Sequence, residues 1–199
     1  MIHLVDDEEA IRRSLGFLLR TSGFSVKAYE SGVAFLKEVK TAELGCILLD
    51  VRMPHMDGLA VQQELNARGV TMPVIVLTGH GDVSIAVRAM KAGAIDFLEK
   101  PFEKTLLLEA LGRAFDRLDR HEDAAVSEQD ARVRVAALTA REQEVLRGLV
   151  QGLPNKTIAY DLGISPRTVE VHRANCMTKL NVRNLSEALR IGFAAGIET

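Results

Sequence analysis

The sequence predicts an α/β fold with a doubly wound five-stranded parallel sheet, followed by a small all-α domain of four helices. Short segments rich in Val, Ile and Leu alternate with helix-period segments through the first 117 residues, as such a sheet requires. Two of them, Cys46–Leu49 and Val74–Leu77, are apolar without alternation, which is typical of strands covered on both faces. Beyond residue 137 only helical patterns occur.

The first domain is placed at residues 1–120, where strands and helices alternate. The strands are predicted at 2–5, 25–29, 46–49, 74–77 and 96–98, and the helices at 8–21, 31–40, 58–68, 83–92 and 103–117. Ligands of such sheets bind beyond the carboxyl ends of the strands.

Residues 121–137 are interpreted as a linker, because the stretch is charged and Ala-rich and contains neither Gly nor Pro. It either continues the fifth helix as a semi-rigid spacer or forms a loose connection, and the sequence leaves both open.

The second domain is placed at 138–199, and its helices are marked by start and stop residues. Thr139 and Glu142 form a capping box, and Ser165 and Pro166 supply an N-cap and a first-turn proline. Gly163 separates two of the helices by a tight turn, which predicts a helix-turn-helix. The four helices are expected at 139–152, 154–162, 165–180 and from 184 onward.

Composition restricts the class of protein. With 47% hydrophobic and 26% charged residues the chain can build a core. Its longest stretch without a charged residue, 69–81, is shorter than the ~20 apolar residues that span a bilayer. No basic start followed by an apolar stretch opens the chain, so we expect a cytoplasmic protein without a membrane span. Cys46 and Cys176 are expected to be reduced thiols.

The net charge of −2 is unevenly divided between the domains. Residues 1–120 carry 15 basic and 17 acidic side chains, whereas residues 138–199 carry 8 basic and 6 acidic ones. The slightly basic second domain is a weak indication of a polyanionic partner.

Polar side chains gather at the carboxyl edge of the predicted sheet. Asp6 and Asp7 follow the first strand and Asp50 follows the third, so three carboxylates should converge. Like charges held that close repel unless a cation intervenes, and oxygen ligands of this kind suit Mg²⁺. Thr78 ends the fourth strand and Lys100 follows the fifth, where a hydroxyl and an ammonium can hold phosphoryl oxygens. Solvated loop residues would explain any one of these side chains, but explain poorly why all five share one edge.

These residues, together with the pairs Met53-Pro54 and Asp57-Gly58, resemble the flavodoxin-like receiver domain of two-component response regulators. The resemblance implies that Asp50 is a phosphoacceptor that attacks a phosphohistidine of a sensor histidine kinase. It also implies that Mg²⁺ is held by Asp6, Asp7, Asp50 and the backbone carbonyl of Arg52.

The same resemblance implies a cis bond between Lys100 and Pro101 and a switch made of two side chains. Thr78 would move towards the phosphoryl group and Phe97 would fill the space, although Phe97 is equally a plain core residue by its strand pattern. Catalysis here can only be positioning and charge neutralisation. We therefore expect no enzyme beyond Mg²⁺-dependent self-phosphorylation and self-dephosphorylation.

The helix predicted at 165–180 has two distinct faces when its residues are spaced by 100°. Val169, Cys176 and Leu180 share a narrow arc that should pack on other helices, with His172 and Arg173 flanking it. The opposite arc would face a major groove, while backbone amides and cations at the helix ends suit phosphates. The expected DNA contacts are Lys156, Thr157, Arg167, Thr168, Glu170, Val171, Arg173, Ala174, Thr178 and Lys179, with Arg183 at the end of the third helix. A small packing bundle with a mixed surface is the alternative.

Gly152–Ala159 and Ser165–His172 resemble the DNA-binding domain of the NarL/FixJ (LuxR-type) family. This implies a transcription activator that binds promoter DNA and RNA polymerase as a phosphorylated homodimer. Likeness to the FixJ-type members, through Gly79–Asp82, Ala89–Gly93 and Ala159–Asp161, implies oxygen-responsive control of nitrogen-fixation genes under a FixL-like kinase.

One departure concerns the groove-facing arc. Some relatives carry Lys where this chain has Glu170 and Ala174, so their phosphate contacts should not be carried over.

A dimer is expected through the fourth helix and the fifth strand, with Val87, Lys91 and Asp96, because Thr78 and Phe97 bracket this face. Three alternatives remain. One is a regulator of the same family for another stimulus. Another is a Mg²⁺-dependent phosphohydrolase, which would need an acid two residues after Asp50, where Arg52 stands. The third is a binding module without phosphoryl chemistry.

Overall fold

The computed structural model describes residues 1–79, 83–120 and 128–197. Predictions that concern residues 80–82 and 121–127 lie outside the described residues. The chain divides into two compact units, one of residues 1–80 and 91–123 and one of residues 81–90 and 124–199. The predicted domain bounds at 120 and 138 stay a prediction.

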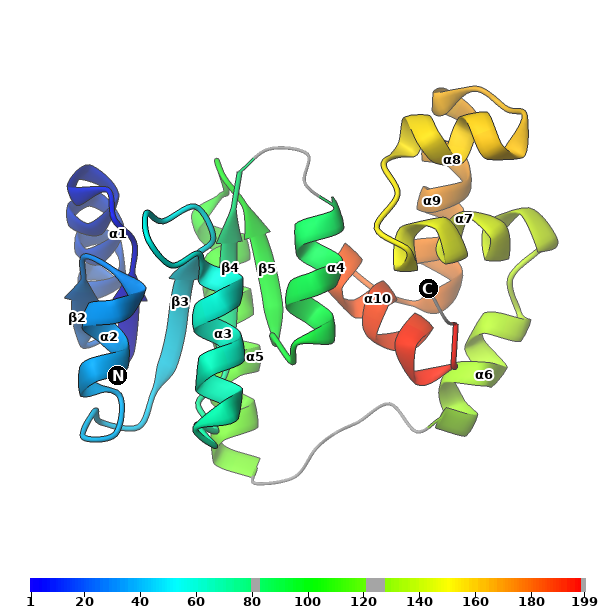
Figure 1. Cartoon of the computed structure of the whole chain (residues 1–199). Helices are drawn as coiled ribbons and strands as arrows, with labels where there is room; N and C mark the ends of the chain where they lie inside the picture. The colour runs from blue at the N-terminus through cyan, green and yellow to red at the C-terminus, as the bar shows by residue number, and fades with distance from the viewer. Residues whose placement is uncertain (80–82, 121–127, 198–199) are drawn as a thin grey trace. The chain divides into compact units, whose positions relative to one another are not determined.

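The first unit contains the predicted sheet of five parallel strands, in the order β2-β1-β3-β4-β5 (Figure 1). The strands are β1 (Ile2–Val5), β2 (Val26–Tyr29), β3 (Cys46–Asp50), β4 (Val74–Thr78) and β5 (Asp96–Glu99). Every residue of β3 and β4 is buried, in line with their uninterrupted apolar sequences. The predicted doubly wound α/β class is confirmed.

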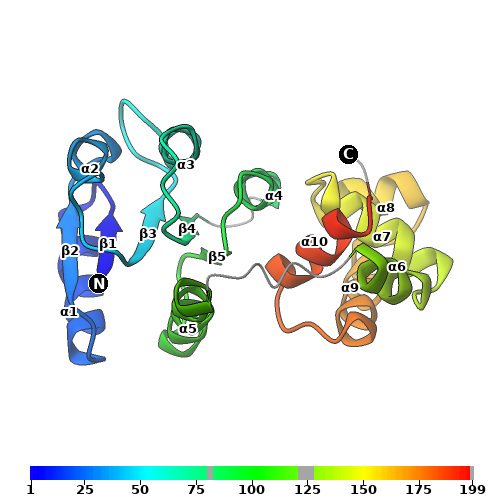
Figure 2. The ribbon, with the colours of Figure 1, turned by 90° about the horizontal axis from the view of Figure 1, so that it is seen from below.

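The helices between the strands are α1 (Glu9–Thr21), α2 (Gly32–Glu38), α3 (Gly58–Ala67), α4 (Val83–Lys91) and α5 (Lys104–Arg120). Figure 2 shows α1 and α5 on one face of the sheet and α2 and α3 on the other. The core beneath α1 and α5 is built from alternate strand residues and from one apolar stripe of each helix. Its members include Ile2, Leu4, Leu15, Leu19, Leu48, Ile75, Leu77, Leu107 and Leu111.

The four helices predicted for the second domain are present as α7 (Ala140–Val150), α8 (Asn155–Leu162), α9 (Pro166–Leu180) and α10 (Leu185–Ala194). Both halves of the capping box between Thr139 and Glu142 form, and Ser165 caps α9 by accepting a hydrogen bond from Thr168. Gly163 adopts the left-handed conformation in the turn between α8 and α9, with φ of 65°.

The structure adds a helix to these four, α6 (Glu128–Ala136), within the predicted linker. Ala131 of α6 is fully buried, and the helix packs against α10 and α9. Residues 128–136 are therefore a helical part of the second unit.

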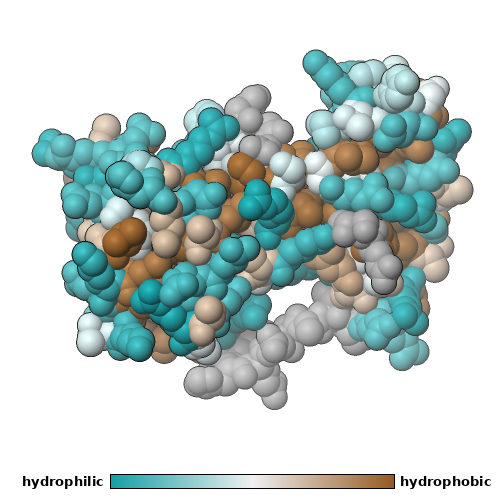
Figure 3. Space-filling model, viewed as in Figure 1, coloured by the Kyte–Doolittle hydropathy of each residue, from teal (hydrophilic) through white to brown (hydrophobic). Residues whose placement is uncertain are grey.

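Figure 3 shows one face of the molecule, on which hydrophilic side chains cover much of the surface of each unit and hydrophobic residues gather in patches. Within residues 1–79, 83–120 and 128–197, none of the helices is both long and apolar enough to span a bilayer.

Candidate phosphoacceptor pocket and DNA-binding helix

The carboxyl ends of β1, β3, β4 and β5 bring together four of the five predicted pocket residues. Asp6 follows β1, Asp50 ends β3 and Thr78 ends β4, and all three are buried. Lys100 follows β5 and donates its backbone N–H to the carbonyl oxygen of Thr78 at 2.7 Å. The Lys100–Pro101 bond is cis, as predicted.

Lys100 is the centre of this pocket. Its Nζ lies 2.6 Å from Oδ1 of Asp50 and 2.8 Å from Oδ2 of Asp6, so one ammonium bridges two buried carboxylates. The lysine side chain is itself only 23% exposed. Such charge-assisted hydrogen bonds hold both acids in a single geometry.

The charges of the pocket do not balance. Burial raises the pKa of Asp50, although the hydrogen bond from Lys100 opposes this effect. Burial would lower the pKa of Lys100, but the hydrogen bonds to Asp50 and Asp6 outweigh it, so the pKa is raised and the ammonium persists. Two buried carboxylates and one ammonium leave a surplus negative charge, which favours an additional cation.

The loop after β1 is held by a residue that sequence reasoning missed. Nη1 of Arg12, one turn into α1, donates to the carbonyl oxygens of Asp6 at 2.9 Å and Asp7 at 2.7 Å. Oδ1 of Asp6 accepts the backbone N–H of Glu8 at 2.9 Å. The sequence contained one indication of this role: Arg12 is a basic residue five positions after the acidic pair Asp6-Asp7, at the start of a predicted helix.

The loop after β3 depends on a close approach of the backbone. A Cβ on Gly58 would lie 2.2 Å from the carbonyl oxygen of Asp50, so only glycine fits there. Asp57 caps α3 by accepting the N–H of Ala60 at 2.7 Å. The pair Asp57-Gly58 therefore shapes the loop that follows Asp50. The guanidinium of Arg52 lies against Gly79, where β4 has just ended.

The predicted Mg²⁺ ligands are partly brought together. Asp6 and Asp50 meet at Lys100, while Asp7 is half-buried in the loop beside them. Among the residues that the structure describes, no group of three His, Cys, Asp or Glu side chains is close enough to hold a metal ion. The donors at this edge are carboxylate and carbonyl oxygens with a surplus negative charge, which is the chemistry that Mg²⁺ prefers, so the residues fit the ion.

The predicted switch and dimer residues occupy different environments. Phe97 is half-buried on β5, and Oγ1 of Thr78 reaches the Gly79 carbonyl at 3.4 Å, which is long for a hydroxyl donor. Asp96 is buried, and its carboxylate accepts hydrogen bonds from the N–H of Phe97 and from Arg113 of α5. Val87 and Lys91 lie on α4, where Val87 is buried and Lys91 is exposed.

The two faces of α9 match the predicted arcs. Val169, Cys176 and Leu180 are buried, and His172 and Arg173 are half-buried beside them. The opposite face is exposed along its whole length, and consists of Arg167, Glu170, Val171, Ala174 and Thr178.

That exposed face contains an apolar residue and an ion pair. Val171 is 51% exposed, although it is apolar. Arg167 and Glu170 lie 3.7 Å apart at the face's N-terminal end.

The residues predicted to contact phosphates behave differently from one another. Lys156 is exposed in the first turn of α8, with Thr157 half-buried next to it. The hydroxyl of Thr168 is hydrogen-bonded to that of Ser165 at 2.8 Å. Nζ of Lys179 donates instead to Oε2 of Glu142 in α7, at 2.8 Å, and Arg183 is exposed after α9.

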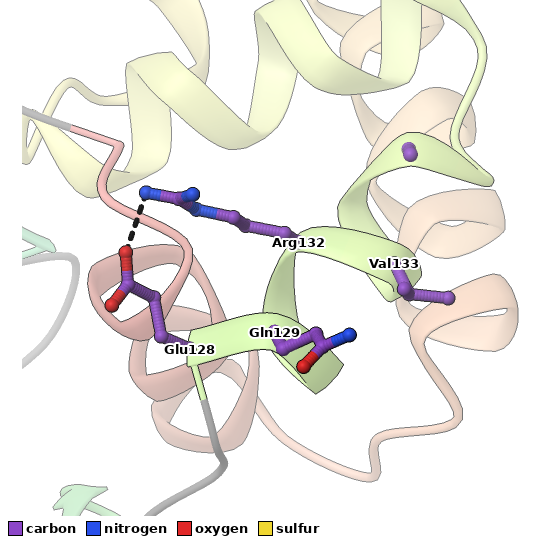
Figure 4. A pocket seen from close by; sticks show the side chains of 5 residues that line it. Glu128, Gln129, Arg132 and Val133 are labelled. Atoms are coloured by element: carbon purple, nitrogen blue, oxygen red, sulfur yellow. Dashed lines mark ion pairs between the residues drawn. The ribbon is translucent and has the colours of Figure 1, made fainter.

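A shallow hollow lies on the outer side of α6, away from these residues. Figure 4 shows Arg132 turned towards Glu128, to which it is ion-paired, while Val133 points away from the pair. Gln129 and Ala136 complete its lining. None of the predicted site residues lines it.

Comparison with known proteins agrees with both halves of the chain. Residues 2–112 match the response regulator receiver domain family, and residues 136–191 match the bacterial regulatory proteins of the luxR family.

Relatives extend over almost the whole chain. FixJ of Azorhizobium caulinodans is 52% identical, over 98% of this chain and 93% of that protein. The C4-dicarboxylate transport regulatory protein DctR of Rhodobacter capsulatus is 44% identical, over 96% and 98%. The crystal structure of full-length FixJ from B. japonicum aligns with a TM-score of 0.59 and 43% identity, over 100% and 98%. The chain therefore belongs to the FixJ-like two-component response regulators that carry a LuxR-type DNA-binding domain.

Proposed function

We propose that this chain is a transcription activator that is switched on by phosphorylation of Asp50, then dimerises and binds promoter DNA. The observation that carries the proposal is the pairing of Asp50 with Lys100 at the carboxyl edge of the sheet, in a chain that also exposes one face of α9.

The phosphoryl transfer is derived from the pocket. A carboxylate oxygen of Asp50 forms a bond to the phosphorus of a phosphohistidine of a sensor kinase, and the P–N bond breaks with its electron pair returning to the imidazole. The ammonium of Lys100 neutralises phosphoryl oxygens, and the hydroxyl of Thr78 donates to one of them. Arg12 keeps the loop of Asp6 and Asp7 in place while charge builds up.

Mg²⁺ is the cofactor that we assign to Asp6, Asp7, Asp50 and the carbonyl of Arg52, and it would supply further positive charge to the phosphoryl oxygens. The chemistry is confined to the chain's own phosphorylation and dephosphorylation. A phosphohydrolase is not favoured, because the residue two positions after Asp50 is Arg52, and a guanidinium does not give up a proton at neutral pH.

Activation is proposed to proceed through Thr78 and Phe97 to a dimer face on α4 and β5. Lys91 would contact the partner, Val87, which is buried, would support this face from within, and Asp96, which is engaged with Arg113, would order the edge of β5. A two-fold dimer presents two α9 helices to two half-sites, where RNA polymerase is the expected further partner.

We infer control of nitrogen-fixation genes in response to oxygen, under a kinase that resembles FixL. Similarity to FixJ proteins over nearly the full chain supports this inference. The alternative is another stimulus, since a relative named for C4-dicarboxylate transport is 44% identical over 96% of this chain.

The test is labelling with radioactive acetyl phosphate and Mg²⁺, with oligomeric state and DNA affinity measured in parallel. The parent should take up label and dimerise, and its DNA affinity should rise by about 10²-fold, because a second half-site contact gains from effective concentration. Asp50→Asn should abolish all three effects. Asp57→Asn is the matched control, since Asn preserves the cap of α3. Label that persists on Asp50→Asn would contradict the proposal.

A further inference from the structure

Glu142 lies at the junction of two helices and receives two hydrogen bonds on one oxygen. Its Oε2 accepts the backbone N–H of Thr139 at 2.8 Å, within the capping box of α7, and accepts Nζ of Lys179 from α9, also at 2.8 Å. The Glu142 side chain is 4% exposed and that of Lys179 is 41% exposed. The carboxylate is thus buried, and Lys179 is its cationic partner.

The pair is placed where it can set the orientation of α9. Lys179 is in the last turn of α9, beside the fully buried Leu180, and Cys176 is buried one turn earlier. A cation in the last turn of a helix also interacts favourably with the helix dipole. The start of α7 and the end of α9 are thereby tied together by one ion pair.

Direct phosphate binding by Lys179 fits these observations poorly. To reach a phosphate, the ammonium would have to leave Glu142 and strand a buried carboxylate, which is costly. At 100° per residue, Lys179 lies about 80° around the helix from Val171 and about 100° from Leu180, between the exposed and the buried faces.

We propose that Lys179 is a positioning residue for DNA binding: through its ion pair with Glu142 it fixes the rotation of α9 and so aims Arg167, Glu170 and Val171 at the base edges. The inference rests on the DNA-binding function proposed above. It replaces the sequence-based expectation that Lys179 contacts a phosphate.

The experiment compares the full-length variants Lys179→Met, Lys179→Arg and Glu142→Gln after treatment with acetyl phosphate and Mg²⁺. Two probes are used, a duplex enriched by the parent from a random-sequence pool and a sheared heterologous duplex. Affinity is measured against salt concentration, because each lost phosphate contact lowers the slope of log affinity against log salt by about one.

Lys179→Met should lose about tenfold in affinity for the enriched duplex, with the salt slope and the affinity for heterologous DNA unchanged. Lys179→Arg should restore most of the loss, because its guanidinium can pair with Glu142. Lys156→Met is the matched control, and its slope should fall by about one, because Lys156 is exposed at the start of α8.

The double variant tests the pairing itself. Glu142→Gln keeps an acceptor for the Thr139 N–H, so α7 remains capped and the protein stays folded. If the two residues act as a pair, Glu142→Gln and Lys179→Met together should lose no more affinity than either alone. Thermal unfolding by circular dichroism establishes that each variant is folded at the temperature of the binding assay.

Three results would overturn the inference: a salt slope reduced by one in Lys179→Met, an unchanged affinity for the enriched duplex, or losses that add in the double variant. If the parent enriches no sequence at all, the proposed function and this inference fall together. If the parent enriches a sequence but the salt slope of Lys179→Met is reduced, the proposed function stands and only this inference is contradicted.

Discussion

At the scale of single residues, the pocket of the first unit is held together mainly by the hydrogen bonds of charged side chains. Lys100 keeps Asp6 and Asp50 close without neutralising both, which leaves a surplus negative charge in the pocket. Arg12 acts on backbone carbonyl oxygens rather than on a carboxylate. One kind of contact therefore sets the charge of the pocket, and the other sets the position of its backbone.

His3 is expected to make the stability of the sheet domain depend on pH. It is buried on β1, and its Nε2–H donates to the Glu43 carbonyl at 2.7 Å. Burial lowers its pKa below the ordinary 6.5, so the unfolded chain takes up the proton first. The contribution of neutral His3 to stability is therefore complete above about pH 6.5 and is lost as the pH falls through the folded-state pKa.

The measurement is the free energy of unfolding in urea between pH 8 and pH 5. A Tyr160→Phe background leaves Tyr29 as the only tyrosine, so its fluorescence reports on the sheet domain. The parent should lose about 1.4 kcal/mol for each pKa unit of depression, and His3→Phe should flatten that dependence. Equal pH dependence in both proteins would contradict the assignment.

At the scale of elements, short loops position the residues of the pocket, and one of these loops requires a glycine. Gly58→Ala should destabilise the chain by about 1–3 kcal/mol, because a Cβ would collide with the backbone of Asp50 and Val51. Labelling of Asp50 should slow as well, since the backbone of Asp50 and the loop that follows it must shift.

Gly112→Ala in α5 is the control, because a Cβ there meets nothing within 4 Å and alanine favours a helix. Chemical denaturation and labelling with acetyl phosphate should therefore separate the two variants. Parent-like labelling of Gly58→Ala would show that this close approach does not matter to the pocket.

Three helices of the second unit, α7, α9 and α10, have a side-chain cap at their N-terminus, and this explains why their bounds could be predicted well. Thr139, Ser165 and Asn184 each accept a backbone N–H from the third residue of the following helix. The helix α6 was harder to assign, because its sequence combines alternating charges with a single fully buried residue, Ala131.

At the scale of the whole molecule, two routes of activation lead to different expectations for the isolated second domain. If the first domain inhibits DNA binding, residues 124–199 alone should bind DNA without phosphorylation, because the first domain can then no longer restrict access to the exposed face of α9. The measurement is the affinity of this fragment and of the unphosphorylated full chain for the same duplex. Equal affinities would point to dimerisation as the switch.

The dimer itself is tested by Lys91→Glu. Lys91 is exposed at the end of α4, so a reversed charge should weaken the phosphorylated dimer and its promoter binding while labelling of Asp50 continues. Sedimentation velocity with and without acetyl phosphate measures the first effect. A phosphorylated Lys91→Glu protein that dimerises as the parent does would exclude this face.

The features that the sequence by itself determined are those that depend on neighbouring residues or on a periodic pattern. Strand and helix spacing, the caps, the residues at the carboxyl edge and the two faces of α9 all follow from side chains that are near in sequence or repeat at a fixed interval. Even the cis bond before Pro101 was expected, although from family resemblance rather than from physics.

Only the tertiary structure decided which charges pair. Lys100 bonds to Asp6 across 94 residues, Lys179 bonds to Glu142 across 37, and Arg113 is engaged with Asp96. A sequence pattern does not encode such partners, because they depend on which elements pack together and on which side chains lose their water. For this reason the sequence suggested a DNA contact for Lys179 but not its bond to the buried carboxylate of Glu142.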